Sequence, residues 1–305
     1  MIYLGKLWGD FDDEHKKFYI SKIEKAISKL KKEGLAISTI AANFLQENIQ
    51  DIVSSEIEDI HRVLDFYERK YLSEKLRRKM AEKISKHISY ENFSKKVDGK
   101  RNLCYEMCLK FSNVLKIKCC PFCQINSVLS KGDAENYNYR SDLDHFFCKT
   151  KYPFLSISIW NLIPICKDCN TTFKGSKNFF SEKHQNPMFD EEEVEFDFMG
   201  SILNSVDVQS SLINIRVSLD SVLIKNSLNT FDLIHRYENL AMSFLLERLT
   251  FYSTYKNCVD SGKYEGFNSN ILEDLFIGAS REEYKKNQFG KLKLDFDNFL
   301  IKINN

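Results

Sequence analysis

Two pairs of cysteines lie at the spacing that metal-binding turns use. Cys120 and Cys123 form one C-x-x-C pair, Cys166 and Cys169 form the second, and 42 residues separate the pairs. Each pair presents two thiolates on one tight turn, so two pairs complete the tetrahedral ligand set of zinc. Cys119 competes with Cys120 as the first ligand, and an iron–sulfur cluster or four reduced buried cysteines are the alternative interpretations. We favour zinc, which would be structural because four cysteines leave no open ligand position.

The stretch that the two pairs enclose, together with the residues just after it, contains side chains that hydrolytic chemistry uses. Asp144 and His145 are adjacent, Asn161 follows them, and Asn170 and Lys174 come directly after the second pair. Phosphodiester hydrolysis needs a base for water, a Lewis acid on the phosphate and stabilisation of the departing oxygen. An imidazole is a competent base at neutral pH, and carboxylate and amide oxygens suit Mg²⁺. Each residue alone is a weak signal, and their joint order supports the prediction.

The joint order resembles the HNH endonucleases, which share a ββα-metal fold. The matching features are Asp-His at the end of a short strand, Asn-Leu-x-Pro before the second cysteine pair, and Cys-Asn opening a helix with a lysine in its first turns. The similarity is greatest to the branch in which two C-x-x-C pairs hold a structural zinc, and it covers residues 118–187. It implies a divalent-metal-dependent endonuclease that hydrolyses DNA, with RNA left open as a substrate.

The resemblance implies a role for each of these side chains. Asp144 and Asn170 would be the protein ligands of a catalytic Mg²⁺ or Mn²⁺, and His145 would be the general base. Asn161 would hold the loop that carries His145 in register, and Lys174 would contact phosphate. The chain departs from the histidine-rich form of the motif at Asn170, which argues against a histidine-ligated transition metal. Lys174 also lies four residues beyond Asn170, where many relatives have their basic residue at three.

The regions that flank this segment are expected to be mostly helical. Apolar residues recur at helical spacing before it, and alternation typical of strands follows it. The expected helices cover residues 20–30, 57–71, 72–84, 102–115, 234–252 and 292–303, and the expected strands cover 194–198 and 213–217. We therefore predict an α+β chain, mainly helical, with a central zinc-clipped ββα-metal (HNH) unit. The predicted divisions are an N-terminal helical region, the nuclease domain and a C-terminal strand and helix region, at 1–116, 117–190 and 191–305.

Composition places the chain among soluble globular proteins and leaves its partner open. Of 305 residues, 43% are hydrophobic and 29% are charged, and no apolar run reaches the length of a membrane span. The chain also starts without the apolar core of a signal peptide, so we expect a cytoplasmic protein without a membrane partner. The net charge of +1 averages a net +8 over residues 1–189 with a net −7 over residues 190–305. The acidic part is a poor DNA surface and a better candidate for binding a protein.

Two further segments and two other function classes stay open. The basic run over residues 69–86 is either a solvated helix face or a phosphate-facing one. Residues 232–239 resemble C-terminal parts of bacterial HNH proteins that accompany ATPases in phage defence, as in Septu-type systems. This second resemblance implies a role in anti-phage defence or restriction, and a nuclease subunit that is active only with an ATPase partner. The other class is a non-catalytic, zinc-dependent nucleic-acid-binding module that keeps the fold without the reaction.

Overall fold

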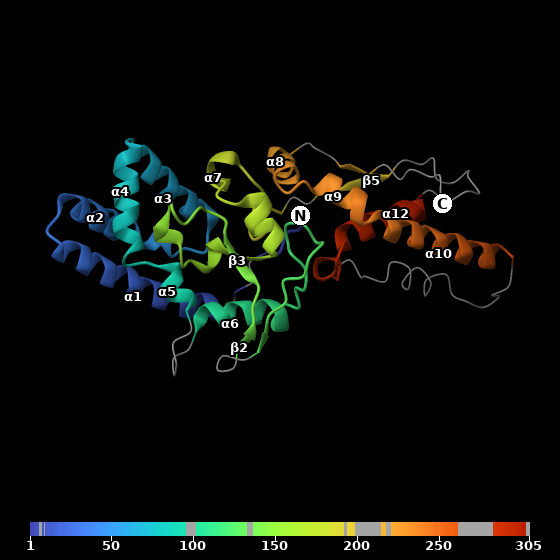
Figure 1. Ribbon diagram of the computed structural model, residues 1–305, viewed down its shortest axis with the longest axis horizontal. Coiled ribbons are helices and arrows are strands. Elements are labelled where there is room, and N and C mark those ends of the chain that lie inside the picture. The colour runs from blue at the N-terminus through green and yellow to red at the C-terminus, as the bar shows by residue number, and fades with distance from the viewer. Residues whose placement is uncertain are drawn as a thin grey trace.

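The protein has an α+β fold that is mostly helical (Figure 1). The strands form three two-stranded antiparallel sheets in the part of the chain that the structure describes. The computed structural model describes residues 1–5, 8, 10–95, 102–132, 137–191, 194–198, 215–217, 221–261 and 283–302. Over these ranges, no helix combines the length and the apolar character needed to cross a membrane.

The N-terminal part is a set of packed helices that begin the chain's hydrophobic core. The predicted helices over residues 20–30, 57–71 and 72–84 are confirmed, and two further helices, α2 and the short α5, were not predicted. Gly34 ends the first helix with a φ of 66°, a left-handed conformation that glycine adopts without steric cost. The helices are α1 (Asp10–Lys32), α2 (Ala36–Ile52), α3 (Ile57–Lys70), α4 (Glu74–Ser85), α5 (Tyr90–Ser94) and α6 (Leu103–Leu109).

The central part contains a hairpin followed by a short helix. Strand β3 (Asp142–His145) pairs antiparallel with β4 (Leu162–Ile165), and the register places His145 opposite Leu162. The π-helix η4 (Asp168–Lys174) follows β4 directly. The other elements of this part are the π-helix η1 (Lys110–Val114), which continues α6, strands β1 (Lys131–Gly132) and β2 (Tyr137–Tyr139), the 3₁₀ turns η2 (Pro153–Leu155) and η3 (Ile159–Asn161), and helix α7 (Phe179–Glu182).

The C-terminal part has one small sheet and several helices. The prediction of one continuous helix over residues 234–252 is wrong in one respect. The backbone turns at Ala241, so this stretch forms two helices. The strands predicted over residues 194–198 and 213–217 appear as shorter strands, and residues 213–214 lie outside the described residues. The elements are β5 (Phe196–Phe198), β6 (Ile215–Val217), α8 (Val222–Thr230), α9 (Leu233–Leu240), α10 (Met242–Asp260), η6 (Tyr284–Lys286) and α12 (Gly290–Lys302).

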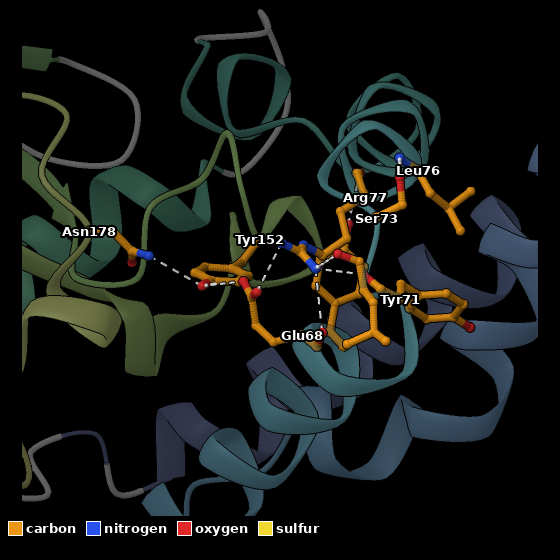
Figure 2. A network of polar contacts seen from close by, with 9 residues as sticks. Glu68, Tyr71, Ser73, Leu76, Arg77, Tyr152 and Asn178 are labelled. Carbon is orange, nitrogen blue, oxygen red and sulfur yellow. Dashed lines mark hydrogen bonds and ion pairs between the residues drawn. The ribbon is translucent and has the colours of Figure 1, made fainter.

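A polar network joins the N-terminal helices to the central part (Figure 2). Arg77 of α4 donates to the carbonyl of Tyr71 at 2.5 Å and lies 3.3 Å from the carboxylate of Glu68. The other oxygen of Glu68 accepts from the hydroxyl of Tyr152 at 2.9 Å, and Asn178 donates to that same hydroxyl at 3.3 Å. Because Tyr152 is buried, these bonds fix the central part against the end of α3.

The basic run over residues 69–86 is largely neutralised within the helical part. Five of its eight cations pair with nearby carboxylates, which favours the solvated-face interpretation for these five residues. The pairs are Arg69 with Asp65, Lys70 with Glu47, Arg77 with Glu68, Arg78 with Glu82, and Lys83 with Glu33. Lys86 belongs to a different surface, which is described below.

Candidate metal centre and active site

The four predicted zinc ligands lie together in a buried cluster. The sulfur atoms of Cys120, Cys123, Cys166 and Cys169 all lie within 4.8 Å of one another. Cys123 Sγ and Cys166 Sγ are 3.9 Å apart. Zinc–sulfur bonds of about 2.3 Å in a tetrahedron would place sulfur atoms about 3.8 Å apart, so the cluster fits a metal ion such as zinc. Cys119 lies outside the cluster and donates to the carbonyl of Lys286 at 3.3 Å.

Neighbouring N–H groups point at the cysteine sulfurs. The backbone N–H of Ile125 donates to Cys123 Sγ at 3.4 Å, and Asn126 Nδ2 donates to Cys166 Sγ at 3.7 Å. The carbonyl of Cys120 accepts from the N–H of Gln124 at 2.7 Å, which closes the first turn. Donors around a sulfur cluster stabilise thiolates and orient metal ligands, so the surroundings also fit a metal centre.

Helix α9 contacts this cluster from the C-terminal part of the chain. Arg236 Nη1 lies 3.5 Å from Cys169 Sγ, and the hydroxyl of Tyr237 donates to the carbonyl of Cys123 at 2.6 Å. Four thiolates around one Zn²⁺ carry a net charge of −2, which the Arg236 guanidinium partly offsets. No local pattern connects Arg236 with the cysteines, since 67 positions separate it from Cys169.

Four of the five residues assigned to catalysis line one open cavity of 450 Å³. Asp144 and His145 come from the end of β3, and Asn170 and Lys174 come from η4. Although Asp144 and His145 are neighbours in a strand, both border this cavity because the strand ends at His145. Asn161, the fifth residue, is buried behind the cavity and does not line it.

The carboxylate of Asp144 is buried and only partly satisfied. Its Oδ1 accepts from the ammonium of Lys174 at 2.5 Å, and that ammonium also donates to the carbonyl of His145 at 2.6 Å. Its Oδ2 is buried with no hydrogen-bond partner. Burial raises the pKa of the Asp144 carboxyl, and the nearby Lys174 ammonium opposes that rise. An unpartnered buried carboxylate oxygen favours binding of a cation.

The imidazole of His145 is oriented by two contacts. Its Nε2 lies 2.8 Å from the carbonyl oxygen of Ser156, which can only accept, so Nε2 carries the hydrogen and Nδ1 has the lone pair. The ring of Tyr90 packs edge-on at 4.5 Å between ring centroids. Burial lowers the pKa of His145 to about 3, so the ring is neutral at physiological pH and is a weaker base than a solvated imidazole.

Asn161 ties together the loop that follows His145. Its Oδ1 accepts from the N–H of Phe147 at 2.6 Å, and its Nδ2 donates to the carbonyls of Phe147 and Leu155, both at 3.0 Å. The backbone carbonyl of Asn161 also accepts from the N–H of Phe146 at 3.0 Å. These four bonds start from one buried residue and restrain the backbone directly after β3.

The helix that carries Asn170 and Lys174 has a π-helical turn. The N–H of Gly175 donates to the carbonyl of Asn170 at 3.0 Å, a bond that spans five residues rather than four. The wider turn accommodates one extra residue, which accounts for Lys174 reaching Asp144 from a position four residues beyond Asn170. Asn170 Nδ2 donates to Asp142 Oδ2 at 3.2 Å, leaving Oδ1 as the atom suited to a cation.

The sequence interpretation gave no role to several side chains that line the same cavity. They include Tyr90, Arg140, Lys149 and Lys177, and they bring the cationic groups at the cavity to four beside two carboxylates. Arg140 and Lys149 lie close to the Asp144-His145 pair in the sequence, so a local excess of positive charge could have indicated them. Tyr90 lies 55 positions before His145, so only the fold reveals it.

Comparison of the chain with models of known protein families, with curated proteins and with solved structures gives no match. The chemistry proposed for this cavity therefore depends on the contacts described above and on the motifs between Cys120 and Gly175.

Proposed function

We propose that this protein is a divalent-metal-dependent endonuclease of the HNH type that hydrolyses DNA phosphodiester bonds. The observation that carries the proposal is the convergence of Asp144, His145, Asn170 and Lys174 on one cavity. A hairpin and the helix after it supply all four, and the four-cysteine cluster joins the turn at Cys120 and Cys123 to the junction of β4 and η4. This combination supports a ββα-metal unit clipped by a structural zinc.

The donor set fits a hard divalent cation. We assign Asp144 and Asn170 as its protein ligands, because a buried carboxylate oxygen without a partner and an amide oxygen border the same cavity. Oxygen ligands of this kind suit Mg²⁺ or Mn²⁺, which retain several waters. A cation held there would polarise the scissile phosphate and stabilise the negative charge that develops during hydrolysis.

His145 is the base in this proposal. Its neutral ring has Nδ1 available to take a proton from a water molecule, while Nε2–H stays bonded to the carbonyl of Ser156. The water oxygen then bonds to phosphorus, the bond from phosphorus to the departing sugar oxygen breaks, and that oxygen takes a proton from solvent. The Ser156 carbonyl stabilises the imidazolium that forms, and the bonds of Asn161 keep the following loop in place.

Lys174 has a different role here from the phosphate contact that the resemblance implies. Its ammonium is buried and already held by Asp144 and the His145 carbonyl. We therefore assign Lys174 to positioning these two residues. Lys149 and Lys177 line the same cavity, and we assign the contact with phosphate oxygens to them.

Cleavage of supercoiled plasmid tests the proposal. The wild-type chain should convert plasmid to nicked or linear forms with Mg²⁺ and should not do so with EDTA. His145→Ala should cut at least about 100-fold more slowly, because general bases contribute that much or more. His235→Ala is the matched control, since His235 is exposed on α9 away from the cavity. Equal cutting by His145→Ala and the wild type would remove His145 as the base.

The ATPase partner and the role in phage defence remain proposals that rest on the resemblance of residues 232–239. Two residues of this segment, Arg236 and Tyr237, contact the cysteine cluster. Contacts inside this chain therefore account for the presence of these two residues without a partner protein. If the nuclease works only with an ATPase, the complex purified from the native operon should cut plasmid and the isolated chain should not.

A further inference from the structure

A second cavity lies on the N-terminal helical part, apart from the candidate active site. It has a volume of 440 Å³ and lies between α1, the end of α4, α5 and the start of α6. Figure 1 shows α5 between α1 and the hairpin strand β3. Among the described residues, no carboxylate lines it, and four lysines do: Lys22, Lys29, Lys86 and Lys95. We refer to this site as the lysine cavity.

The charge of the lysine cavity is not neutralised by neighbouring acids. Among the described residues, no ion pair joins any of its four lysines to a carboxylate. Glu33 lies nearby, 3.3 Å from His87 of the cavity wall, but it also accepts from Lys83 and Ser38. The hydrogen bond from Lys83 lowers the pKa of Glu33 to about 2, so this carboxylate is already engaged. The cavity therefore attracts an anion that comes from outside the chain.

Two aromatic rings also line the lysine cavity. Phe18 and Phe93 are half-buried, with ring centroids 6.1 Å apart, and Lys22 Nζ lies 5.3 Å from the Phe18 ring. Proteins that bind single-stranded nucleic acids combine a basic groove with aromatic side chains on which bases stack. A small anion would need the lysines alone, so the half-buried rings in the lining favour a ligand that carries both phosphates and bases.

The lysine cavity connects to the candidate active site through one intermediate hollow. That hollow shares Ile88 and Ser89 with the lysine cavity, and it shares Tyr90, Lys149 and Thr150 with the active-site cavity. Its charges are mixed, because Lys149 pairs with Glu91 at 2.6 Å. Helix α5 thus contributes lining residues to both cationic sites: Tyr90 to the active-site cavity, and Asn92 and Phe93 to the lysine cavity.

We propose that the lysine cavity binds a single-stranded stretch of the same nucleic acid whose phosphodiester bond lies at His145. The lysines hold consecutive phosphates, and Phe18 and Phe93 contact bases. The inference rests on the proposed nuclease function for its choice of ligand. It adds a second contact site, which favours substrates that have an unpaired segment beside the cut.

A binding measurement tests the inference separately from cleavage. Fluorescence anisotropy reports the binding of a fluorescein-labelled 20-nucleotide single strand in the absence of divalent cation. Lys22→Gln/Lys86→Gln should raise the Kd about tenfold. It should also reduce the slope of log K against log salt by about 1.4, since each phosphate contact to a single strand contributes about 0.7. Phe93→Leu should raise the Kd about fivefold and leave that slope unchanged. Thermal melting checks that each variant is folded.

The matched control is Lys31→Gln/Lys225→Gln, which removes the same charge from two lysines that line none of the three hollows. Its Kd should stay within about twofold of the wild type. Equal weakening by both double variants, or no measurable binding by the wild type, would overturn the inference. So would tighter binding of a duplex of the same sequence, or displacement of the strand by polyglutamate as readily as by unlabelled strand.

Cleavage assays separate failure of this inference from failure of the nuclease proposal. If no form of the chain cuts plasmid but Lys22→Gln/Lys86→Gln weakens strand binding selectively, the lysine cavity stands as a binding site and the nuclease proposal fails. If the wild type cuts and Lys22→Gln/Lys86→Gln binds and cuts like it, the nuclease proposal stands and this inference is overturned. If both hold, the double variant should raise KM and leave kcat unchanged.

Discussion

At the scale of single residues, the chemistry depends on a few buried polar groups whose partners are unusual. Asp144 has one oxygen on Lys174 and one without a partner, and His145 has one nitrogen on a carbonyl and one with its lone pair available. Both arrangements leave an atom that an external ligand can use. Buried polar groups are normally satisfied within the protein, and the presence of both atoms beside one cavity supports a functional site there.

The four-cysteine cluster gives the first prediction at this scale. The purified wild-type chain should contain one zinc per molecule by inductively coupled plasma mass spectrometry. Cys123→Ser should lose the metal and melt at a lower temperature, because the folding energy of a structural zinc site comes from its four ligands. Cys119→Ser is the matched control, since Cys119 lies next to the cluster but outside it, and it should retain zinc. Equal zinc content in both variants would contradict this ligand set, and iron in place of zinc would contradict the metal.

At the scale of elements, segments far apart in sequence contact the two turns that carry Cys120 with Cys123 and Cys166 with Cys169, which we call the cysteine turns. The N–H of Ile2 donates to the carbonyl of Pro121 at 3.1 Å, and Gln124 bonds to Tyr284 and Lys291 near α12. Helix α9 adds Arg236 and Tyr237. The cysteine turns therefore join the start of the chain and the C-terminal part to the hairpin.

Helix α9 should contribute to metal retention. Arg236→Gln removes the cation beside Cys169, so the negative charge of the four thiolates is less well compensated. We expect the zinc affinity to fall about tenfold or more, as it does when groups around metal ligands are removed. Competition with a chromogenic chelator measures the zinc affinity. Arg62→Gln, at an exposed position of α3, is the control. Identical zinc release from wild type and Arg236→Gln would show that the contact has no influence on the metal.

Helix α1 makes the stability of the protein sensitive to acid through His15. Its ring is buried against Tyr19, Phe18 and Phe93, and burial lowers its pKa from 6.5 to about 4. Between these two values the unfolded chain binds a proton that the folded chain does not, so stability rises with pH in that window and is lost as pH falls.

Substitution of this histidine isolates the effect. The free energy of unfolding of the wild type should fall between pH 7 and pH 5 by about 2 kcal/mol more than that of His15→Phe, as linkage with these pKa values requires. Urea unfolding at both pH values, followed by circular dichroism, measures the difference. Parallel loss of stability in the two proteins would show that His15 does not titrate as described.

At the scale of the whole molecule, the basic and acidic parts of the chain are used differently. The net +8 of residues 1–189 includes the candidate active site and the lysine cavity, and the net −7 lies in residues 190–305. The part with excess positive charge therefore has both surfaces proposed to bind a polyanion. The C-terminal part packs on the cysteine turns and supports the unit from the other side.

Much of this organisation can be read from the sequence where the signal is local. The cysteine spacing predicts which sulfurs come together, and clean apolar stripes predict α1, α3, α4 and α12. Helix α2 was missed because small residues weaken its stripe: Ser38, Ala41 and Ala42 are among its buried positions. The π-helical turn of η4 was also not predicted. The only sequence signal is that Lys174 lies four residues beyond Asn170 instead of three, and this spacing does not by itself specify a backbone conformation.

What the sequence could not predict depends on contacts between distant positions. Tyr90 packs on His145 and Arg236 reaches Cys169 only because the helical regions fold over the hairpin. The lysine cavity draws its cations from α1, from the end of α4 and from the position directly after α5. No local pattern encodes such a combination, since each lysine alone is typical of a solvated helix face.

The dependence of cleavage on Mg²⁺ concentration in Asp144→Asn tests the central claim most directly. Asparagine keeps the shape of Asp144 but removes its charge, which weakens the ligand for the cation. The melting temperature should fall, because the buried Lys174 ammonium loses its counter-charge, so cleavage is compared at a temperature at which circular dichroism shows the variant folded. We expect the Mg²⁺ concentration for half-maximal cleavage to rise about tenfold or more, and the maximal rate to fall about 100-fold. Cleavage by Asp144→Asn at the wild-type rate and with the wild-type Mg²⁺ dependence would contradict the assignment of this cavity as the catalytic centre.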